Sequence, residues 1–184
     1  MGRKILFAGL AVLFGGAIFA VLLYLPGGST PPRRPLESPV QDPDARTAVH
    51  LYFSDRANEY LLAEKRGLER TGDPVSDAVA VIEALIAGPE GDLVPTLPPQ
   101  TRLRTLFLVE GGRAVVDFTE AIRAHHPGGS RTELLTVYSV INSLVLNISE
   151  IETVQILVDG KEADTLAGHI DLRYPFKADM LMVR

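Results

Sequence analysis

An uncharged apolar segment near the N-terminus constrains this chain more than any other feature. Residues 5–25 contain no charged side chain, and the next charge after Lys4 is Arg33. As an α-helix a segment of this length spans about 30 Å, the thickness of the hydrocarbon core of a bilayer. We therefore predict one transmembrane anchor over residues 1–25, with the N-terminus in the cytoplasm.

A cleavable signal peptide is the alternative interpretation of this segment. The apolar stretch of a signal peptide usually runs about 7–15 residues and ends in a small-x-small site. The stretch here is longer, and its nearest small pair, Gly27 and Ser29, stands next to Pro26. A buried core helix fits less well, because apolar residues cover every helical face. We favour an uncleaved anchor.

A proline-rich segment follows over residues 26–48. It holds six of the 13 prolines of the chain. Proline at this density is incompatible with a helix or a central strand. The segment is expected to be an extended linker that holds the next domain at most about 70 Å from the membrane. A disordered spacer is the other interpretation.

The composition excludes several functional classes. The chain has 184 residues, a net charge of −5 and no cysteine. An acidic protein lacks the basic surface that non-specific nucleic-acid binding needs, so no nucleic-acid partner is expected. Without cysteine there is no disulfide, thiolate metal site, cysteine nucleophile or lipid-modified N-terminal cysteine.

Residues 49–184 are predicted to form one domain of helices and strands. Two amphipathic helices are expected, one after an N-cap at Asp73 and one behind a Ser130–Glu133 capping-box pattern. β-rich runs predict the strands, although a helix remains open for the second of them. These strands cover residues 49–54, 60–68, 103–109, 114–118 and 154–158.

The connections between these elements predict the fold class. Gly111-Gly112 is a hairpin turn, far too short for the crossover that two parallel strands need. Paired strands between helices favour an α+β fold of two layers. We predict a mainly antiparallel sheet with two helices packed on one face, preceded by one transmembrane helix.

Such a sheet has a second face that the helices leave uncovered. Leu106, Leu108 and Leu157 are the candidates for a partner-binding patch on this sheet. In the alternative interpretation the C-terminal arm covers the second face with its own apolar side chains. These are Leu172, Tyr174, Phe176, Met180, Leu181 and Met182.

No residue pattern predicts a catalytic or metal centre. The four histidines form no His-Glu-x-x-His motif, and no glycine-rich phosphate loop precedes a helix. Asp117 and Glu120 are conceivable as an acid–base pair, and His169 lies near a carboxylate, but structural roles are favoured for all three. We expect no enzymatic activity, no catalytic residue, no cofactor and no metal ligand.

The domain also carries motifs that resemble a known family. In chain order they are Tyr52-Phe53-Ser54-Asp55, Arg66, Leu85 with Gly88-Pro89, Pro98, Thr101, Val116-Asp117-Phe118-Thr119, Glu133, Val137-Tyr138-Ser139-Val140-Ile141-Asn142-Ser143-Leu144 and Val154-Gln155-Ile156-Leu157-Val158-Asp159-Gly160. Together they resemble the GerMN domain, a module named for spore-germination and sporulation proteins. It is also found in envelope proteins of bacteria that do not sporulate.

The resemblance implies a small α+β module similar to the ring-building modules of secretion assemblies. It also implies tethering to the outer side of the cytoplasmic membrane and a role in assembly or protein interaction rather than catalysis. This chain departs from the family pattern in lacking a lipid-attachment cysteine and in having one module rather than two. The first departure agrees with an uncleaved helix as the anchor.

These interpretations lead to an expected location and function. We expect a single-pass protein of the cytoplasmic membrane with its C-terminal domain in the periplasm or other extracytoplasmic space. Its expected function is binding and scaffolding in a cell-wall, division or sporulation-type assembly, with envelope proteins, including peptidoglycan-related ones, as partners. Two alternatives stay open: a peptidoglycan-acting enzyme or hydrolase regulator using Asp117, Glu120 or His169, and a muropeptide sensor.

Overall fold

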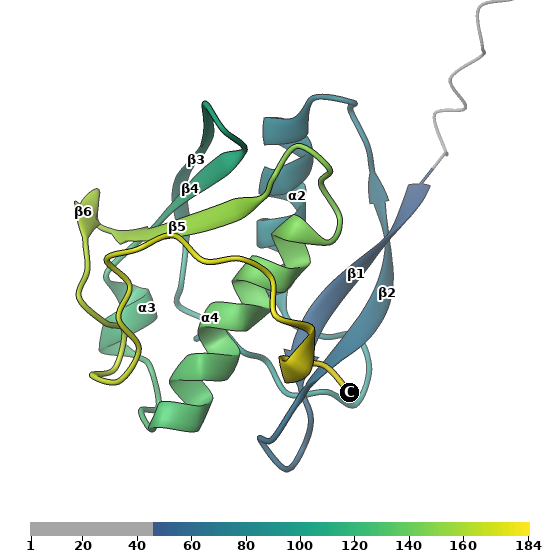
Figure 1. The fold of residues 1–184 in the computed structure, drawn as a ribbon. Helices are drawn as coiled ribbons and strands as arrows, with labels where there is room; N and C mark the ends of the chain where they lie inside the picture. Colours follow the sequence, from purple (N-terminus) through teal and green to yellow (C-terminus); the bar gives the residue numbers. More distant parts are fainter. Residues whose placement is uncertain (1–45) are drawn as a thin grey trace, which may run out of the picture. The chain divides into compact units, whose positions relative to one another are not determined.

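The chain folds around two small sheets rather than one. The computed structural model describes residues 46–184. Its elements are β1 (Arg46–Ser54), β2 (Leu61–Glu69), α2 (Pro74–Ala87), β3 (Leu103–Val109), β4 (Arg113–Phe118), α3 (Ala121–Ala124), α4 (Ser130–Val145), β5 (Thr153–Val158), β6 (Lys161–Glu162) and the 3-10 helix η1 (Met180–Met182) (Figure 1). The α+β class and all the expected strands are confirmed, with small shifts of their ends.

The predicted N-terminal features lie largely outside the described residues. These are the anchor over residues 1–25 and the linker up to residue 45. The last three residues assigned to the linker belong to β1, which begins at Arg46. Within residues 46–184, no helix combines the length and the apolar character needed to cross a membrane.

The mainly antiparallel pairing is confirmed, but there are two sheets instead of one, and one strand pair is parallel. β1 and β2 form an antiparallel pair by themselves, and the second sheet has the order β3-β4-β5-β6. β3 is antiparallel to β4 across the predicted Gly111-Gly112 turn, but β5 is parallel to β4. The parallel pair is possible because α4 supplies a crossover between these two strands.

Helices α2 and α4 pack against each other, and each contacts both sheets. α2 begins as predicted, since the carboxylate of Asp73 accepts a hydrogen bond from the backbone N–H of Ser76 at 2.9 Å. The helix ends at Gly88, whose φ of 89° lies in the left-handed region that favours glycine. The largest fully buried side chains of the core include Phe53, Ile82, Phe118, Ile141 and Ile156.

The predicted capping box at the start of α4 is wrong. The N-cap position is Gly129, and no side chain caps the helix there. The carboxylate of Glu133 instead accepts hydrogen bonds from the backbone N–H groups of Leu166, Ala167 and His169 at 2.8, 2.9 and 2.9 Å. Glu133 therefore holds the C-terminal arm rather than its own helix.

Polar side chains on α4 and just after it form hydrogen bonds with the edge of β1 that faces away from β2. Asn147 accepts from the N–H of His50 at 2.9 Å and donates to its carbonyl at 2.8 Å. The N–H of Tyr52 donates to the hydroxyl of Ser143 at 3.1 Å, and Ser139 donates to the carbonyl of Tyr52 at 2.6 Å. Four residues of an α-helix advance about 6 Å along its axis, which nearly matches the length of two residues in a strand. The helix thus satisfies a strand edge without another strand.

This edge pairing predicts the effect of a single substitution. Ser143→Ala leaves the buried N–H of Tyr52 without its acceptor, so we expect the free energy of unfolding to fall by about 1–3 kcal/mol. Urea unfolding followed by circular dichroism measures the difference. Ser149→Ala is the matched control, because within residues 46–184 this exposed hydroxyl hydrogen-bonds to Glu150 alone and should change stability by at most about 0.5 kcal/mol. Equal losses in both variants would contradict the assigned role.

Candidate functional site

The three leucines predicted to bind a partner do not form one patch. Leu106 lies opposite Val116 in the β3–β4 register and is 6% exposed within the core. Leu108 lies two residues along the strand, faces the same side and packs against the core. Leu157 lies beside Asp117 in the β4–β5 register, on the opposite face. The interpretation as one patch is corrected, because the register through β4 separates these side chains.

The C-terminal arm covers an edge of the second sheet. Phe176 and Val154 exchange two backbone hydrogen bonds of 2.8 Å, which extends the sheet beyond β5. The side-chain amide of Gln155 donates to the carbonyl of Leu172 at 2.7 Å, and Leu172 is fully buried in the core. The arm therefore protects the edge of β5.

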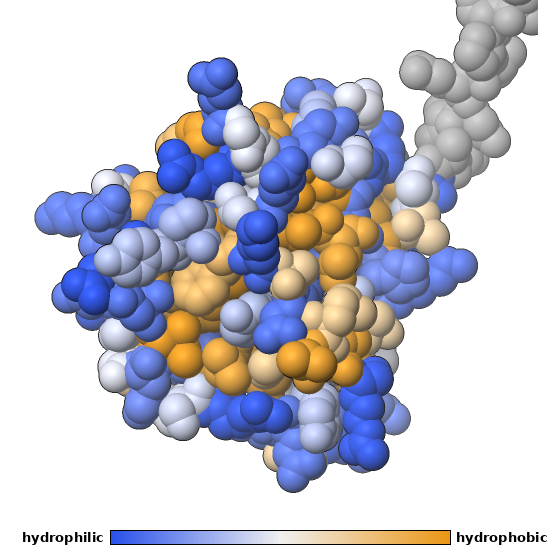
Figure 2. All heavy atoms as spheres, in the orientation of Figure 1, coloured by the Kyte–Doolittle hydropathy of each residue, from blue (hydrophilic) through white to orange (hydrophobic). Residues whose placement is uncertain are grey.

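The end of the arm exposes apolar side chains. Met180 and Leu181 in η1 are 55% and 87% exposed, and Tyr174 is 67% exposed. An apolar patch lies over η1, the short yellow turn beside the C-terminus (Figures 1 and 2). Only some of the arm residues considered from the sequence are thus buried.

Asp117 holds a turn. One carboxylate oxygen accepts a hydrogen bond from Arg104 at 2.7 Å, and the other accepts the N–H of Gly160 at 2.8 Å. Glu120 adjoins the same turn, since its backbone N–H donates to the carboxylate of Asp159 at 3.2 Å, while its own side chain is exposed. Both oxygens of Asp117 are engaged within the chain, which is the arrangement of a structural carboxylate.

His169 belongs to a different cluster. Its ring Nδ1 lies 3.0 Å from the buried carboxylate of Glu133. Burial alone would raise the pKa of Glu133, but the N–H groups of Ala167 and His169 and the His169 ring together hold this pKa below its ordinary value. Within residues 46–184, no contact joins His169 to Asp117 or Glu120, so the three candidates for acid–base chemistry are not assembled.

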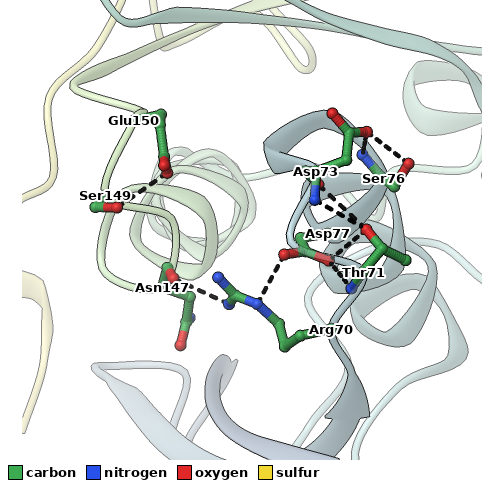
Figure 3. A network of polar contacts seen from close by, with 8 residues as sticks. All are labelled: Arg70, Thr71, Asp73, Ser76, Asp77, Asn147, Ser149 and Glu150. Atoms are coloured by element: carbon green, nitrogen blue, oxygen red, sulfur yellow. Dashed lines mark hydrogen bonds and ion pairs between the residues drawn. The ribbon is translucent and has the colours of Figure 1, made fainter. Parts of the chain in front are cut away.

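A third polar cluster lies at the start of α2 (Figure 3). The buried carboxylate of Asp77 pairs with Arg70 at 2.8 Å and accepts from the backbone and hydroxyl of Thr71. Arg70 also donates to the carbonyl of Asn147 at 3.2 Å. This network ties the β2–α2 connection to the end of α4 and is structural as well.

A surface cavity of about 310 Å³ is the strongest candidate for a binding site. One wall is the proline-rich connector before β3, and the other is the loop before α4 together with Thr132. The lining residues are Pro95, Thr96, Leu97, Pro98, Pro99, His125, Pro127 and Thr132. The sequence showed both segments as loops but gave no signal that they face each other, because their contacts depend on α4.

Hydrogen bonds to α4 hold both walls of this cavity. Thr136 donates to the carbonyl of Thr96 at 2.6 Å, and the hydroxyls of Thr96 and Ser139 lie 2.5 Å apart. The loop wall is held by His126, whose Nδ1 accepts the N–H of Gly128 at 3.0 Å and whose Nε2 contacts Thr136 at 3.1 Å. Since Nδ1 accepts, Nε2 carries the proton of the neutral ring.

The lining of the cavity is largely apolar and uncharged. Its lining is mostly proline and leucine, with the threonine hydroxyls and the imidazole of His125 as polar groups. It holds no carboxylate, lysine or arginine. In the part of the chain that the structure describes, no three His, Asp or Glu side chains are grouped to hold a metal ion. A small ligand that presents apolar or uncharged polar groups to the lining fits this surface best.

Comparison with known proteins gives one family and several similar structures. The family model for sporulation and spore germination, Germane, matches residues 50–164. No curated protein matches the chain. A Clostridium perfringens protein described as a lipoprotein is 25% identical, with a TM-score of 0.52 over 72% of this chain and 87% of that one.

Two structures of the sporulation protein GerM from Bacillus subtilis share the fold. Its first GerMN domain is 23% identical, with a TM-score of 0.55 over 72% of this chain and 96% of that one. Its tandem GerMN domains are 20% identical, with a TM-score of 0.53 over 73% of this chain and 46% of that one. The resemblance found in the sequence motifs is confirmed.

The environment of His126 predicts a pH dependence of stability. Burial lowers the pKa of this imidazole, although Glu133 opposes the shift. The unfolded state then binds more protons than the folded one just below the ordinary histidine pKa of about 6.5. Stability should therefore fall as the pH is lowered through that value, and His126→Gln should remove this part of the slope.

Urea unfolding at a series of pH values measures this slope. His125→Gln is the matched control, because the neighbouring imidazole is exposed and makes no hydrogen bond within residues 46–184. We expect the control to keep the slope of the unmodified protein. A slope unchanged in His126→Gln would show that a different group titrates in this range.

Proposed function

The chain belongs to the Germane family of sporulation and spore germination, and from this premise we propose that it is a membrane-tethered binding and scaffolding module of the bacterial cell envelope. The module would act on the outer side of the cytoplasmic membrane, in a cell-wall, division or sporulation-type assembly. Its partners would be envelope proteins, some of them peptidoglycan-related.

One observation carries the binding role: several polar side chains within the family motifs are bonded to the chain's own backbone. Ser139 and Ser143 bind β1, and Glu133 binds the C-terminal arm. Asn142 exchanges two hydrogen bonds of 3.0 Å with the backbone of Asp179. Residues bonded in this way shape the fold, and their polar groups are not available as nucleophile or base, which supports a binding role.

Two features support the envelope location. The uncharged segment over residues 5–25 has the length of a membrane anchor. The similar Clostridium perfringens protein is described as a lipoprotein, which is a protein attached to a membrane surface. Both features agree with a domain held outside the cytoplasm by its N-terminus.

Topology reporters test this location. An alkaline phosphatase fused after Arg184 should be active and should fractionate with the membrane, whereas a cytoplasm-dependent fluorescent protein at the same point should stay dark. Replacement of Leu10 and Leu13 by arginine is the matched control, because charges at the centre of the anchor oppose insertion by about 2.5–3.5 kcal/mol each. A full-length protein found free in the cytosol would overturn the proposal.

A small-ligand sensor is the second candidate function, and the cavity between the connector and the loop before α4 favours it. If a muropeptide binds there, it should raise the melting temperature of the protein in proportion to its concentration. His125→Trp should reduce this shift, because a larger side chain in the lining fills part of the cavity. Lys177→Trp, on the C-terminal arm and outside the cavity lining, should leave it unchanged. No shift with muropeptides in the unmodified protein would remove this candidate.

A peptidoglycan-acting enzyme, or a regulator of one, is the remaining alternative. Release of wall fragments by the purified protein would support it. Glu120→Gln is the informative variant, because this exposed side chain contributes little to folding, whereas Asp117→Asn also breaks the Arg104 contact. Two results together would count against a catalytic role for these residues. Glu120→Gln would keep the activity, and Asp117→Asn would lose it only when the protein also unfolds.

A further inference from the structure

The outer edge of β2 is an open strand edge within residues 46–184. β1 directs the backbone groups of His50, Tyr52 and Ser54 away from β2, since these groups bind Asn147, Ser143, Ser139 and Val94. In an antiparallel pair, the residues opposite such groups also point outward. The register therefore turns the N–H and C=O groups of Ala63, Lys65 and Gly67 toward the free edge.

These outward groups have no hydrogen-bond partner among residues 46–184. The edge is closed only at Leu61, whose carbonyl accepts the N–H of Arg184 at 3.0 Å. By contrast, β5 is bordered by β6 and Phe176. β3 is also an edge strand, but it is irregular, because its pairing with β4 shifts register between Leu103 and Thr105. An unpaired strand edge is a ready template for another strand.

We propose that β2 pairs antiparallel with β2 of a second copy of this chain, with Gly67 on the two-fold axis. Two two-stranded sheets would then join into one of four strands. A two-stranded sheet alone is marginal, and extension to four adds a ladder of backbone hydrogen bonds. The pairing is isologous, so it closes on itself and forms a dimer rather than a fibre.

Charge selects this register over the others. Outward-pointing residues pair only with outward-pointing residues, and this condition holds for an axis at any residue from Leu62 to Glu69. An axis at Glu64, Lys65, Arg66 or Glu69 places that charged residue opposite its own copy, which is unfavourable. An axis at Leu68 likewise places Arg66 opposite Arg70 of the second copy. An axis at Leu62 or at Ala63 requires Leu61, whose carbonyl already accepts the N–H of Arg184.

The axis at Gly67 places Lys65 of each copy opposite Glu69 of the other copy, which gives two pairs of opposite charge. Both side chains are exposed, and neither forms an ion pair within residues 46–184. Their charges are thus available for a contact across the edge. Gly67 itself places no side chain at the axis, where the two backbones approach each other.

The absence of cysteine makes a direct test possible. Gly67→Cys in the full-length chain places two thiols on directly opposed residues, with Cα atoms about 5.5 Å apart, inside the disulfide range of about 4.4–6.8 Å. Mild oxidation of native membranes, or a short thiol-specific crosslinker, should yield a dimer on a non-reducing gel. A Cβ at this site would meet the Cβ of exposed Arg46 at 3.3 Å, so a small shift admits the residue.

Two single-cysteine controls separate this register from chance collision. Lys65→Cys puts the two thiols four residues out of register, about 14 Å apart along the strands, and should not crosslink. Lys161→Cys on β6 reports random encounters in the membrane. A monomeric Gly67→Cys, or Lys65→Cys that crosslinks equally well, would overturn the proposal. Crosslinking to a different envelope protein in place of a second copy would overturn it as well.

A charge swap tests the selecting contact. In the Gly67→Cys background, Lys65→Glu places a carboxylate opposite Glu69 of the second copy. It should reduce the yield of crosslinked dimer several-fold. Adding Glu69→Lys restores opposite charges and should restore the dimer. Lys177→Glu makes the same change of charge away from β2 and should have no effect. Circular dichroism verifies that each variant stays folded, and failure of the double variant to recover would contradict the assigned register.

Discussion

Helix α4 and the turn after it hold the rest of the domain by hydrogen bonds from side chains to backbone. Ser139, Ser143 and Asn147 bind the edge of β1, while Thr136 binds the connector at Thr96. Glu133 binds the loop that begins at Leu166, and Asn142 binds Asp179 just before η1. Four segments remote in sequence are thus positioned against one helix. The backbone groups they bury would cost about 1–3 kcal/mol each without a partner, so the arrangement is specified residue by residue.

This dependence explains why the helix carries polar residues in its buried face. An apolar stripe alone would pack α4 against a sheet, but it would leave the outer edge of β1 unpaired inside the molecule. The four-residue spacing of Ser139, Ser143 and Asn147 follows the two-residue spacing of His50 and Tyr52 closely enough to satisfy each group in turn. Glu133 extends the same principle with a charge, and its lowered pKa keeps that charge at neutral pH.

The sequence predicted what depends on neighbours in the chain and missed what depends on distant partners. The cap at Asp73, the Gly111-Gly112 hairpin and the amphipathic helices are local signals, and all are present. The capping-box prediction failed because the acceptor at Glu133 is used by residues more than 30 positions away. The parallel β4–β5 pair and the separation of Leu106 from Leu157 follow from a register that no short segment encodes. The cavity was missed for the same reason.

The edges of the sheets are treated differently, and the difference connects the fold to the proposed tether. The β1 edge is satisfied by a helix and the β5 edge by the C-terminal arm, whereas β2 stays open over a few residues. Pairing along so short an edge buries far less than the roughly 1,600 Å² of a standard interface, so it would be weak between molecules free in solution. An N-terminal anchor would confine both copies to one membrane plane and raise their effective concentration without any new contact. A tethered module can therefore use an edge that a freely diffusing protein of the same fold would leave unpaired.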